Sequence, residues 1–180
     1  QESLDLKIYK QKYMTVSDAF EGLPEIHQGE GEEEVEITIN SKNEFIKNIL
    51  GSRRKGKLFN HRATKHSCDV QNRYDNMEEG KDGSCLPLEL QTKKTNYFRL
   101  SQYQPSRTVT CNFRTDLIHP YLPRGLTVRE AARLQSFDDD YCFFGNLTRK
   151  AKFVTQDDQV GNAVPPMFAK ALADHIKRIF

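Results

Sequence analysis

The segment LTVREAARLQSF, residues 126–137, constrains the fold of this chain more than any other. Thr127 and Glu130 stand three residues apart, which is the spacing of a capping box. In that arrangement the threonine side chain accepts from the glutamate backbone amide, and the glutamate side chain reaches back to the threonine amide. The apolar residues that follow recur on one helix face: Ala131, Ala132, Leu134 and Phe137. We therefore expect a helix here with one buried face.

A second informative segment, QVGNAVPP at residues 159–166, leads toward the C-terminus. Gly161 permits a close backbone approach or a positive φ, and Asn162 is a residue type that caps a following helix. The two prolines suit the first turn of a helix, where a missing amide costs nothing. The residues after them recur at helical spacing: Phe168, Ala171, Leu172, His175, Ile176 and Ile179. The pattern predicts a helix over 165–179 with an apolar stripe.

Two shorter helices are expected in the first third of the chain. One begins at a Thr15 or Ser17 cap and ends before Gly22. The other begins at Ser41, because Ser41 and Glu44 again have capping-box spacing, and its apolar face is Phe45, Ile46, Ile49 and Leu50.

Strands are expected where β-forming residues alternate with polar ones. The segments with this pattern are residues 35–40, 97–102 and 107–113. The Glu-rich segment around Gly29 and Gly31 is expected to be an exposed loop. The region from 52 to 96 has no sustained period, so loops and short strands are expected there.

Charge is segregated along a chain whose formal net charge is only +2 over 180 residues. Residues 21–36 contain seven Glu and neither Lys nor Arg, whereas residues 53–73 contain seven Lys or Arg and one acid, Asp69. Such a chain has one face suited to phosphates and one that avoids them. Its length permits one ordinary core, or one core with a small satellite.

Cysteine usage favours an intracellular setting with reduced thiols, because the four cysteines are widely scattered. There is no signal peptide and no apolar run long enough to span a bilayer. The first residue is Gln rather than Met, which favours a fragment or a processed piece over a complete chain.

The two long segments resemble the ninth and tenth motifs of the cytosine-C5 DNA methyltransferases. The first match extends upstream through Ile118-His119-Pro120 and Arg124, and downstream through Asp139, Tyr141 and Gly145. Asp138 departs from the family, which usually has Pro at that position. Residues 15–24 resemble the segment that leaves the catalytic domain in bacterial members. Together the matched pieces cover roughly a third of the chain.

The resemblance implies a role for several residues of these motifs. The helix after Thr127 would support the DNA-reading region, with Arg129 and Glu130 as structural ion-pairing or hydrogen-bonding residues. Asn162 and Val164 match residues that contact S-adenosyl-L-methionine, because the tenth motif helps to close the cofactor pocket. Asp158 stands where the family commonly has a basic or neutral residue.

The resemblance also implies a target-recognition domain that ends in a strand carrying a Thr and then an aliphatic residue. Thr108 and Val109 fit that pattern, and Thr108 would touch the backbone of the nucleotide that is swung out of the duplex; an ordinary strand threonine is the alternative. Basic side chains in such a domain neutralise phosphates and make affinity salt-dependent, whereas a solvated face is the usual explanation of a charge run. The candidates for phosphate contact are Arg53, Arg54, Lys93, Lys94 and Arg99.

Two histidines and a cysteine lie close together in the sequence, but they are a poor match to a metal site. His61, His66 and Cys68 have no fourth ligand nearby in sequence, and their basic neighbours repel cations. No metal is therefore expected.

The residues that perform the family's chemistry are not in this sequence. Attack on C6 of cytosine needs a cysteine thiolate, which the family carries in a Pro-Cys pair, but the four cysteines here follow Ser, Ser, Thr and Tyr. The family's Glu-Asn-Val string and its Gly-rich cofactor turn are also absent. We therefore expect this chain alone to be inactive, with no catalytic residue of its own.

These observations combine into one expectation for fold and function. The fold class is α+β, with a small irregular target-recognition domain plus helices that complete a doubly wound, Rossmann-like methyltransferase domain missing from this chain. The expected parts are residues 1–24 leaving the catalytic domain, 25–120 recognising the target, 121–145 supporting it, and 146–180 closing the cofactor pocket and returning to the catalytic domain.

The expected function is that of the C-terminal portion of a DNA (cytosine-5) methyltransferase of a bacterial or phage restriction-modification system, acting in the cytoplasm. Its expected partners are double-stranded DNA, the N-terminal catalytic part in cis or as a separate subunit, and a second copy of the chain through the C-terminal helix; no membrane is expected. The alternative is a non-catalytic DNA-binding or regulatory subunit of a split methyltransferase.

Overall fold

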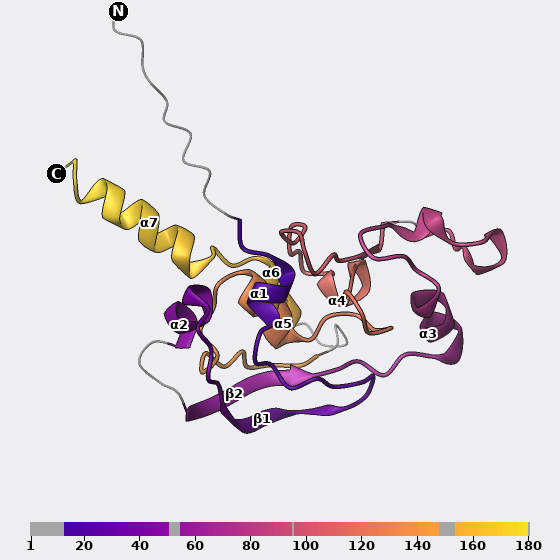
Figure 1. Ribbon diagram of the computed structural model, residues 1–180, viewed down its shortest axis with the longest axis horizontal. Helices are drawn as coiled ribbons and strands as arrows, with labels where there is room; N and C mark the ends of the chain where they lie inside the picture. Colours follow the sequence, from indigo (N-terminus) through magenta and orange to yellow (C-terminus); the bar gives the residue numbers. More distant parts are fainter. Residues whose placement is uncertain (1–12, 51–54, 95, 148–153, 180) are drawn as a thin grey trace, which may run out of the picture.

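The computed structural model describes residues 13–50, 55–94, 96–147 and 154–179 of the chain. It is a mixed structure of short helices and two small sheets (Figure 1). The elements are, in order, α1 Val16–Phe20, β1 Gly31–Thr38, α2 Glu44–Leu50, β2 Lys55–Arg62, α3 Cys68–Asp75, the 3-10 turns η1 Gly83–Cys85 and η2 Leu88–Leu90, β3 Phe98–Arg99, α4 Phe113–Asp116, β4 Leu117–Ile118, α5 Val128–Leu134, α6 Gln156–Gly161 and α7 Pro166–Ile176.

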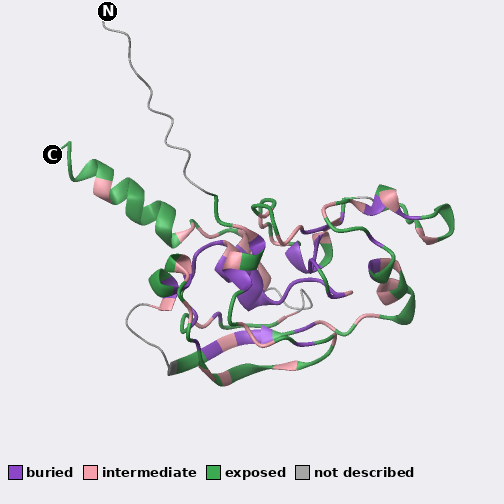
Figure 2. Cartoon of the chain, in the orientation of Figure 1, coloured by how far each residue is buried: buried purple, intermediate pink, exposed green. Residues whose placement is uncertain are grey.

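The helix expected after Thr127 is confirmed as α5, and it lies at the centre of the molecule (Figure 1). Thr127 and Glu130 form both hydrogen bonds of the capping box. Helix α5 packs against α1, α6 and β2, and Figure 2 shows the buried residues gathered around α1 and α5. The main core draws on the whole length of the chain: Val16, Ala19, Phe20, Leu100, Phe113, Leu117, Leu126, Val128, Ala131, Ala132, Phe137, Phe143 and Val160.

The acidic and basic segments form an antiparallel pair of strands, β1 and β2, with Gly31 opposite Arg62 and Thr38 opposite Lys55. The expectation of an exposed loop is therefore wrong for residues 31–34, which belong to β1. Opposite charges placed across two strands attract each other, and Glu34 and Lys57 form an ion pair here. Helix α2 lies in the connection between the two strands.

The short sheet of β3 and β4 is parallel, with Phe98 opposite Leu117. The strand expected at 97–102 is reduced to two residues. The strand expected at 107–113 is wrong, because residues 107–110 form no regular element and Phe113 already begins α4. Alternation of β-forming residues does not make a strand unless a neighbouring strand supplies hydrogen bonds.

One helix begins with a different cap from the one expected, and one helix is itself unexpected. Asn43, rather than Ser41, accepts from a backbone amide of the first turn of α2, that of Phe45, while Ser41 bonds the side chain of Glu21. Helix α3 lies in the region expected to contain only loops and strands. The helix expected from Thr15 is confirmed as α1, with a capping box formed by Thr15 and Asp18.

The C-terminal helix is confirmed as α7, which projects away from the rest of the molecule (Figure 1). None of its residues is buried, as Figure 2 shows. The amide of Met167 donates to the hydroxyl of Ser136, which ties the first turn of α7 to the end of α5. Among the described residues, no helix is both long and apolar enough to cross a membrane.

Candidate functional site

Three arginines of the α5 region are almost fully buried, which is rare for this residue type unless every charge is paired. Arg124, Arg129 and Arg133 are each at most 1% exposed. Burying a guanidinium requires partners for its N–H groups. The three side chains bond to different parts of the chain, so together they fix the segments around α5.

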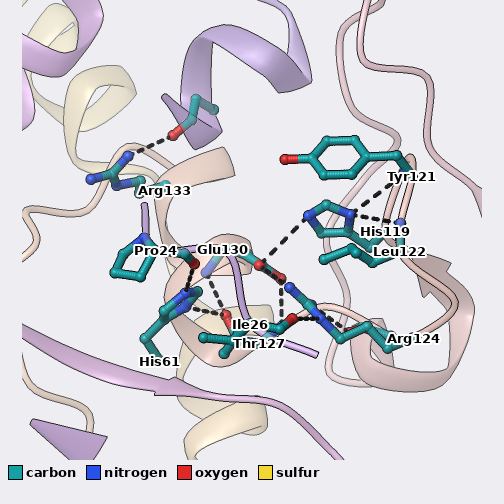
Figure 3. Close-up of polar contacts among 12 residues, drawn as sticks. Pro24, Ile26, His61, His119, Tyr121, Leu122, Arg124, Thr127, Glu130 and Arg133 are labelled. Carbon is teal, nitrogen blue, oxygen red and sulfur yellow. Dashed lines mark hydrogen bonds and ion pairs between the residues drawn. The ribbon is translucent and has the colours of Figure 1, made fainter. Parts of the chain in front are cut away.

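Glu130 is the centre of the first buried network (Figure 3). Its two carboxylate oxygens accept from both terminal nitrogens of Arg124, at 2.7 and 2.9 Å, and one oxygen also accepts from the Thr127 amide. Burial by itself raises the pKa of Glu130, but the charge and hydrogen bonds of Arg124 outweigh burial and hold that pKa well below its ordinary value. Glu130 is therefore ionised, and Arg124 also donates to the carbonyl of Ile26.

His61 connects this network to β2 and to the segment after α1 (Figure 3). Its Nε2 lies 2.8 Å from the carbonyl of Pro24, which only accepts, so Nε2 carries the proton. Its Nδ1 then accepts from the hydroxyl of Thr127 at 3.1 Å. Burial lowers the pKa of His61, which keeps the ring neutral. Both ring nitrogens are thus occupied by protein groups, and no set of three or more candidate metal ligands gathers among the described residues.

His119 faces Glu130 from the other side (Figure 3). Its Nδ1 accepts from the amide of Leu122 at 3.2 Å, so the neutral ring carries its proton on Nε2, which lies 3.8 Å from a carboxylate oxygen of Glu130. Burial lowers the pKa of His119 to about 4, although the charge of Glu130 acts in the opposite direction. The ring also stacks on Phe20 of α1.

Arg129 and Arg133 attach α5 to β2, to α1 and to the segment that follows α5. Arg129 donates to the carbonyls of Phe59, Asp138 and Tyr141, and burial lowers its pKa to about 10. Arg133 forms a two-pronged ion pair with Asp139, at 2.5 and 2.8 Å. It also donates to the carbonyls of Ala19 and Glu21. The partners of Arg129 are carbonyls of other segments, so its role in the structure is to hold the chain together.

A cavity of about 540 Å³ lies beside the end of α5. Its walls come from α1, from the segment around Thr108, from the C-terminal turn of α5 and from the loop after α6. Thr108 is exposed at this cavity. The cavity therefore gathers, at one place, the segment expected to touch DNA and the loop expected to face the cofactor.

A close backbone contact joins those two segments. A Cβ atom added to Gly161 would lie 2.2 Å from the backbone nitrogen of Cys111 and 2.5 Å from the carbonyl carbon of Thr110. Only glycine permits that approach. The thiol of Cys111 also donates to the side-chain oxygen of Asn162 at 3.2 Å. Gly161 thus serves a close approach rather than a positive φ.

Asn162 and Val164 are both exposed on the loop that leads from α6 to α7. Asn162 terminates α6, and Pro165 is the residue before α7. The expectation that Asn162 caps the following helix is therefore wrong. The helix that it terminates is itself unexpected, and it begins with a capping box of Thr155 and Asp158. That bond gives Asp158 a local structural function in this loop.

The basic residues expected to contact phosphates lie in different settings. Arg99 is 7% exposed and donates to the carbonyls of Tyr74, Met77 and His119. The expectation that Arg99 faces phosphate is therefore corrected, because its N–H groups serve the fold. Lys93 is exposed, and Lys94 forms an ion pair with Asp116 at 2.6 Å. Arg53 and Arg54 lie outside the described residues.

The sequence does not single out Arg107 and Arg114, which the structure places close to the candidate site. The guanidinium of Arg107 lies 3.5 Å from the centre of the Phe98 ring, next to Thr108. Arg114 is buried in α4 and forms an ion pair with Asp157 of α6. Both lie in or beside a segment predicted to be a strand, and no local pattern distinguishes them from the other arginines of the sequence.

Comparison with known proteins identifies the family of this chain. The profile of one family, described as C-5 cytosine-specific DNA methylase, matches residues 4–178. The type II methyltransferase M.DdeI of Desulfomicrobium norvegicum is 32% identical over 97% of this chain and 45% of its own length. The type II methyltransferase M.AquIB of Picosynechococcus sp. is 40% identical over 63% of this chain and 84% of its own length.

A solved structure shares the fold. It is a crystal structure described as that of a DNA modification methyltransferase encoded within a prophage (E. coli). It matches with a TM-score of 0.66 and 28% identity over 91% of this chain and 46% of its own. The chain therefore spans less than half of M.DdeI and of this structure, but most of the length of M.AquIB.

Proposed function

Because this chain belongs to the C-5 cytosine-specific DNA methylase family, we propose that it is the C-terminal portion of a DNA (cytosine-5) methyltransferase. In this proposal it recognises the target DNA and closes one side of the S-adenosylmethionine site. The catalytic cysteine lies on an N-terminal part that this chain does not contain. The helices α6 and α7 then complete the doubly wound domain of that N-terminal part.

The single observation that carries the proposal is the contact of Gly161 with Thr110 and Cys111. It holds the Thr108 segment against the loop between α6 and α7, and Thr108, Gly161, Ala163 and Pro165 of these segments line one cavity beside α5. An enzyme that transfers a methyl group to an extruded base must bring the strand and the cofactor to one place. The contact supplies a fixed geometry for that task on the side of the site that this chain forms.

The cofactor would supply the methyl group, and two residues of this chain fit a position beside it. Val164 presents a side chain that is 62% exposed and apolar, and Asn162 presents an exposed amide. An apolar side chain with a few placed polar groups is typical of the wall of a cofactor pocket. The remaining walls belong to the part of the enzyme outside this chain. In this proposal, helix α6 holds Asn162 and Val164 in position for the cofactor.

DNA recognition rests on the Thr108 segment, which lines the cavity beside α5. Thr108 is exposed there, and its hydroxyl is able to donate to a phosphate oxygen. Lys93 provides an exposed positive charge on the same domain. Extruding a base costs a few kcal/mol of unstacking, which contacts to the strand must offset.

Complementation tests the proposal. This chain is mixed with a separately produced N-terminal half of a related enzyme that carries the Pro-Cys pair, and transfer of a labelled methyl group to DNA is followed. We expect neither half to be active alone and the mixture to be active. Methyl transfer that never depends on this chain would refute the proposal.

A second candidate, a non-catalytic DNA-binding or regulatory subunit, is favoured by one comparison. M.AquIB is itself short, since an alignment of 119 residues covers 84% of it. A protein named as a type II methyltransferase can therefore be as short as this chain. Filter binding separates the two candidates. Sequence-specific binding to DNA by this chain without the catalytic half favours the second candidate, whereas specificity that appears only in the mixture favours the first.

A further inference from the structure

The basic segment of β2 and the residues after it does not form one uniform charged face. Lys57 is paired with Glu34 of the neighbouring strand β1. Arg62, the last residue of β2, and Lys65, which follows it, both line a cavity of about 620 Å³. Both side chains are exposed. The opposite wall comes from α4 and includes Arg114. The positive charges of two distant segments therefore converge on one cavity.

Arg114 is unusual among the residues that line this cavity, because it is 8% exposed and incompletely bonded. Its Nε donates to Asp157 at 2.6 Å, and one terminal nitrogen donates to the hydroxyl of Thr64 at 3.1 Å. The other terminal nitrogen is buried and has no hydrogen-bond partner among the described residues. A buried donor of a charged group normally has an acceptor. The guanidinium is thus held in place while both N–H groups of one terminal nitrogen are unused.

The other lining residues supply donors and little negative charge. Asp157 is the one carboxylate among the described lining residues, opposed by three cationic side chains, Arg62, Lys65 and Arg114. Thr64 and Asn112 contribute a hydroxyl and an amide group, whereas the hydroxyl of Thr115 is bonded to Lys94 and Asp116. This composition favours an oxyanion and disfavours a cation.

The position of the cavity indicates where an oxyanion would come from. Cys111 and Asn112 form part of its wall, and Thr108 and Val109 line the cavity beside α5. The segment 108–112 therefore separates the two cavities. A nucleic-acid strand that contacts Thr108 and continues across this segment would bring its next backbone groups to Arg62, Lys65 and Arg114.

We propose that the cavity between the end of β2 and α4 binds a phosphodiester group of the DNA backbone, with Arg62, Lys65 and Arg114 as the cationic side chains. This inference rests on the proposed function, since it assumes that the chain binds DNA. It extends the DNA contact beyond Thr108 to a built subsite on the opposite side of the segment 108–112.

The test uses the full chain and a fluorescent DNA duplex, with anisotropy measured over a series of salt concentrations. The variant R62A/K65A removes the two exposed charges of the cavity without touching buried residues. The matched control is K42A/K47A, which removes two exposed lysines that do not line this cavity. Each phosphate contact that is lost lowers the salt dependence of log K by about 0.9. We expect a slope reduced by about one unit in R62A/K65A, the loss of one phosphate contact, and an unchanged slope in the control.

Three results would overturn the inference, and they are distinguishable. If R62A/K65A and the control both match the wild-type chain, the subsite is wrong and the proposed function stands. If wild type shows no salt-dependent binding to DNA, the proposed function fails and the subsite fails with it. If inorganic phosphate shifts the NMR signals of Thr64 and Thr115 but the duplex does not, the cavity takes a free anion and not DNA. Shifts of both signals by the duplex support the inference.

Discussion

At the scale of single residues, the arginines around α5 set the geometry of the candidate site. Glu130 accepts from Arg124 and from the Thr127 amide, while Thr127 connects to His61 of β2. Each bond joins segments that are distant in sequence. A buried ion pair contributes little net stability as a pair, but removing one partner leaves the other charge buried and unpaired.

Replacing Glu130 with Ala is expected to destabilise the chain strongly. The change leaves Arg124, which is 1% exposed, without its carboxylate, and breaking a buried pair in this way costs about 3–5 kcal/mol. Urea unfolding followed by circular dichroism measures the loss. The control is E34A, because Glu34 pairs with Lys57 at the exposed surface and such pairs contribute about 0–1 kcal/mol. Equal losses in the two variants would contradict the role given to Glu130.

The pH dependence of stability is expected to follow His119. Its pKa in the folded chain is about 4, whereas that of an unfolded chain is about 6.5. Between these values the unfolded chain binds the proton, so stability is fully present above about pH 6.5 and is lost as the pH falls toward 4. The shift corresponds to about 3 kcal/mol at most. Burial lowers the pKa of His61 and His66 as well, which adds loss in the same direction.

The variant H119N isolates this contribution, since the asparagine oxygen takes the place of Nδ1 and does not titrate. We expect the free energy of unfolding of H119N to change less steeply between pH 6.5 and 4 than that of wild type. The difference in slope should correspond to about one proton fewer taken up on unfolding. Urea titrations at four pH values measure the two slopes. Parallel slopes would show that His119 does not titrate on unfolding.

Asn162 is expected to affect cofactor use and not DNA binding. In the reassembled enzyme, N162A should raise the KM for S-adenosylmethionine by about tenfold, the effect of about one lost hydrogen bond. Binding of DNA by this chain should stay at the wild-type value. N146A serves as the control, because Asn146 is an exposed asparagine outside the loop between α6 and α7. Equal loss of cofactor use and DNA binding in N162A would contradict the role proposed for Asn162.

At the scale of elements, α6 holds two segments of the site in contact. Its last residue, Gly161, lies against the backbone of Thr110 and Cys111. Gln135, at the end of α5, donates to the carbonyl of Val160. The loop that follows α6 is therefore fixed on one side by the segment 108–112 and on the other by α5.

Replacing Gly161 with Ala is expected to separate these elements. The new methyl group would meet backbone atoms that cannot move aside, so we expect a loss of about 1–3 kcal/mol in unfolding free energy and reduced methyl transfer on complementation. G56A is the matched control, because nothing lies within 4 Å of a Cβ atom at Gly56. Urea unfolding compares the two variants. A tolerated G161A would show that the contact does not hold the site.

The chain also shows what sequence patterns predict at this scale. The capping boxes of Thr15 and Thr127 are found in α1 and α5, because each needs only residues three apart. The same spacing at Ser41 and Glu44 fails, because Asn43 provides the bond instead. The predictions of short strands are wrong most often. Whether residues 31–34 or 107–113 form a strand depends on a partner strand, which no local pattern reveals.

At the scale of the whole molecule, the four expected parts of the chain share one core. Val16, Leu100, Val128 and Val160 come from different parts and belong to the same buried cluster. The division into four parts is therefore an expectation about function. In the structure the four parts pack into the same core. Helix α7 is the exception, because it has no buried residue and carries exposed apolar side chains.

We expect the apolar side of α7 to mediate association rather than folding. The variant F168E/L172E should leave the free energy of unfolding within about 0.5 kcal/mol of wild type, because neither residue is buried. It should abolish complementation with a catalytic half, and any self-association seen by sedimentation velocity. The control K170A/D174A changes an exposed ion pair on the same helix and should preserve both. A large loss of stability in F168E/L172E would mean that α7 packs on this chain.

The sequence by itself determined the helices that begin after Thr15 and Thr127, the apolar stripe of α7 and the two motifs that resemble the family. These features depend on residues a few positions apart, so the interactions that produce them are visible in the local sequence. Only the tertiary structure decided that Arg99 is buried, that Asn162 ends α6, and that Arg62, Lys65 and Arg114 meet at one cavity. Those outcomes depend on groups as far as 50 or 51 residues away, brought together by burial and hydrogen bonds that no local pattern encodes.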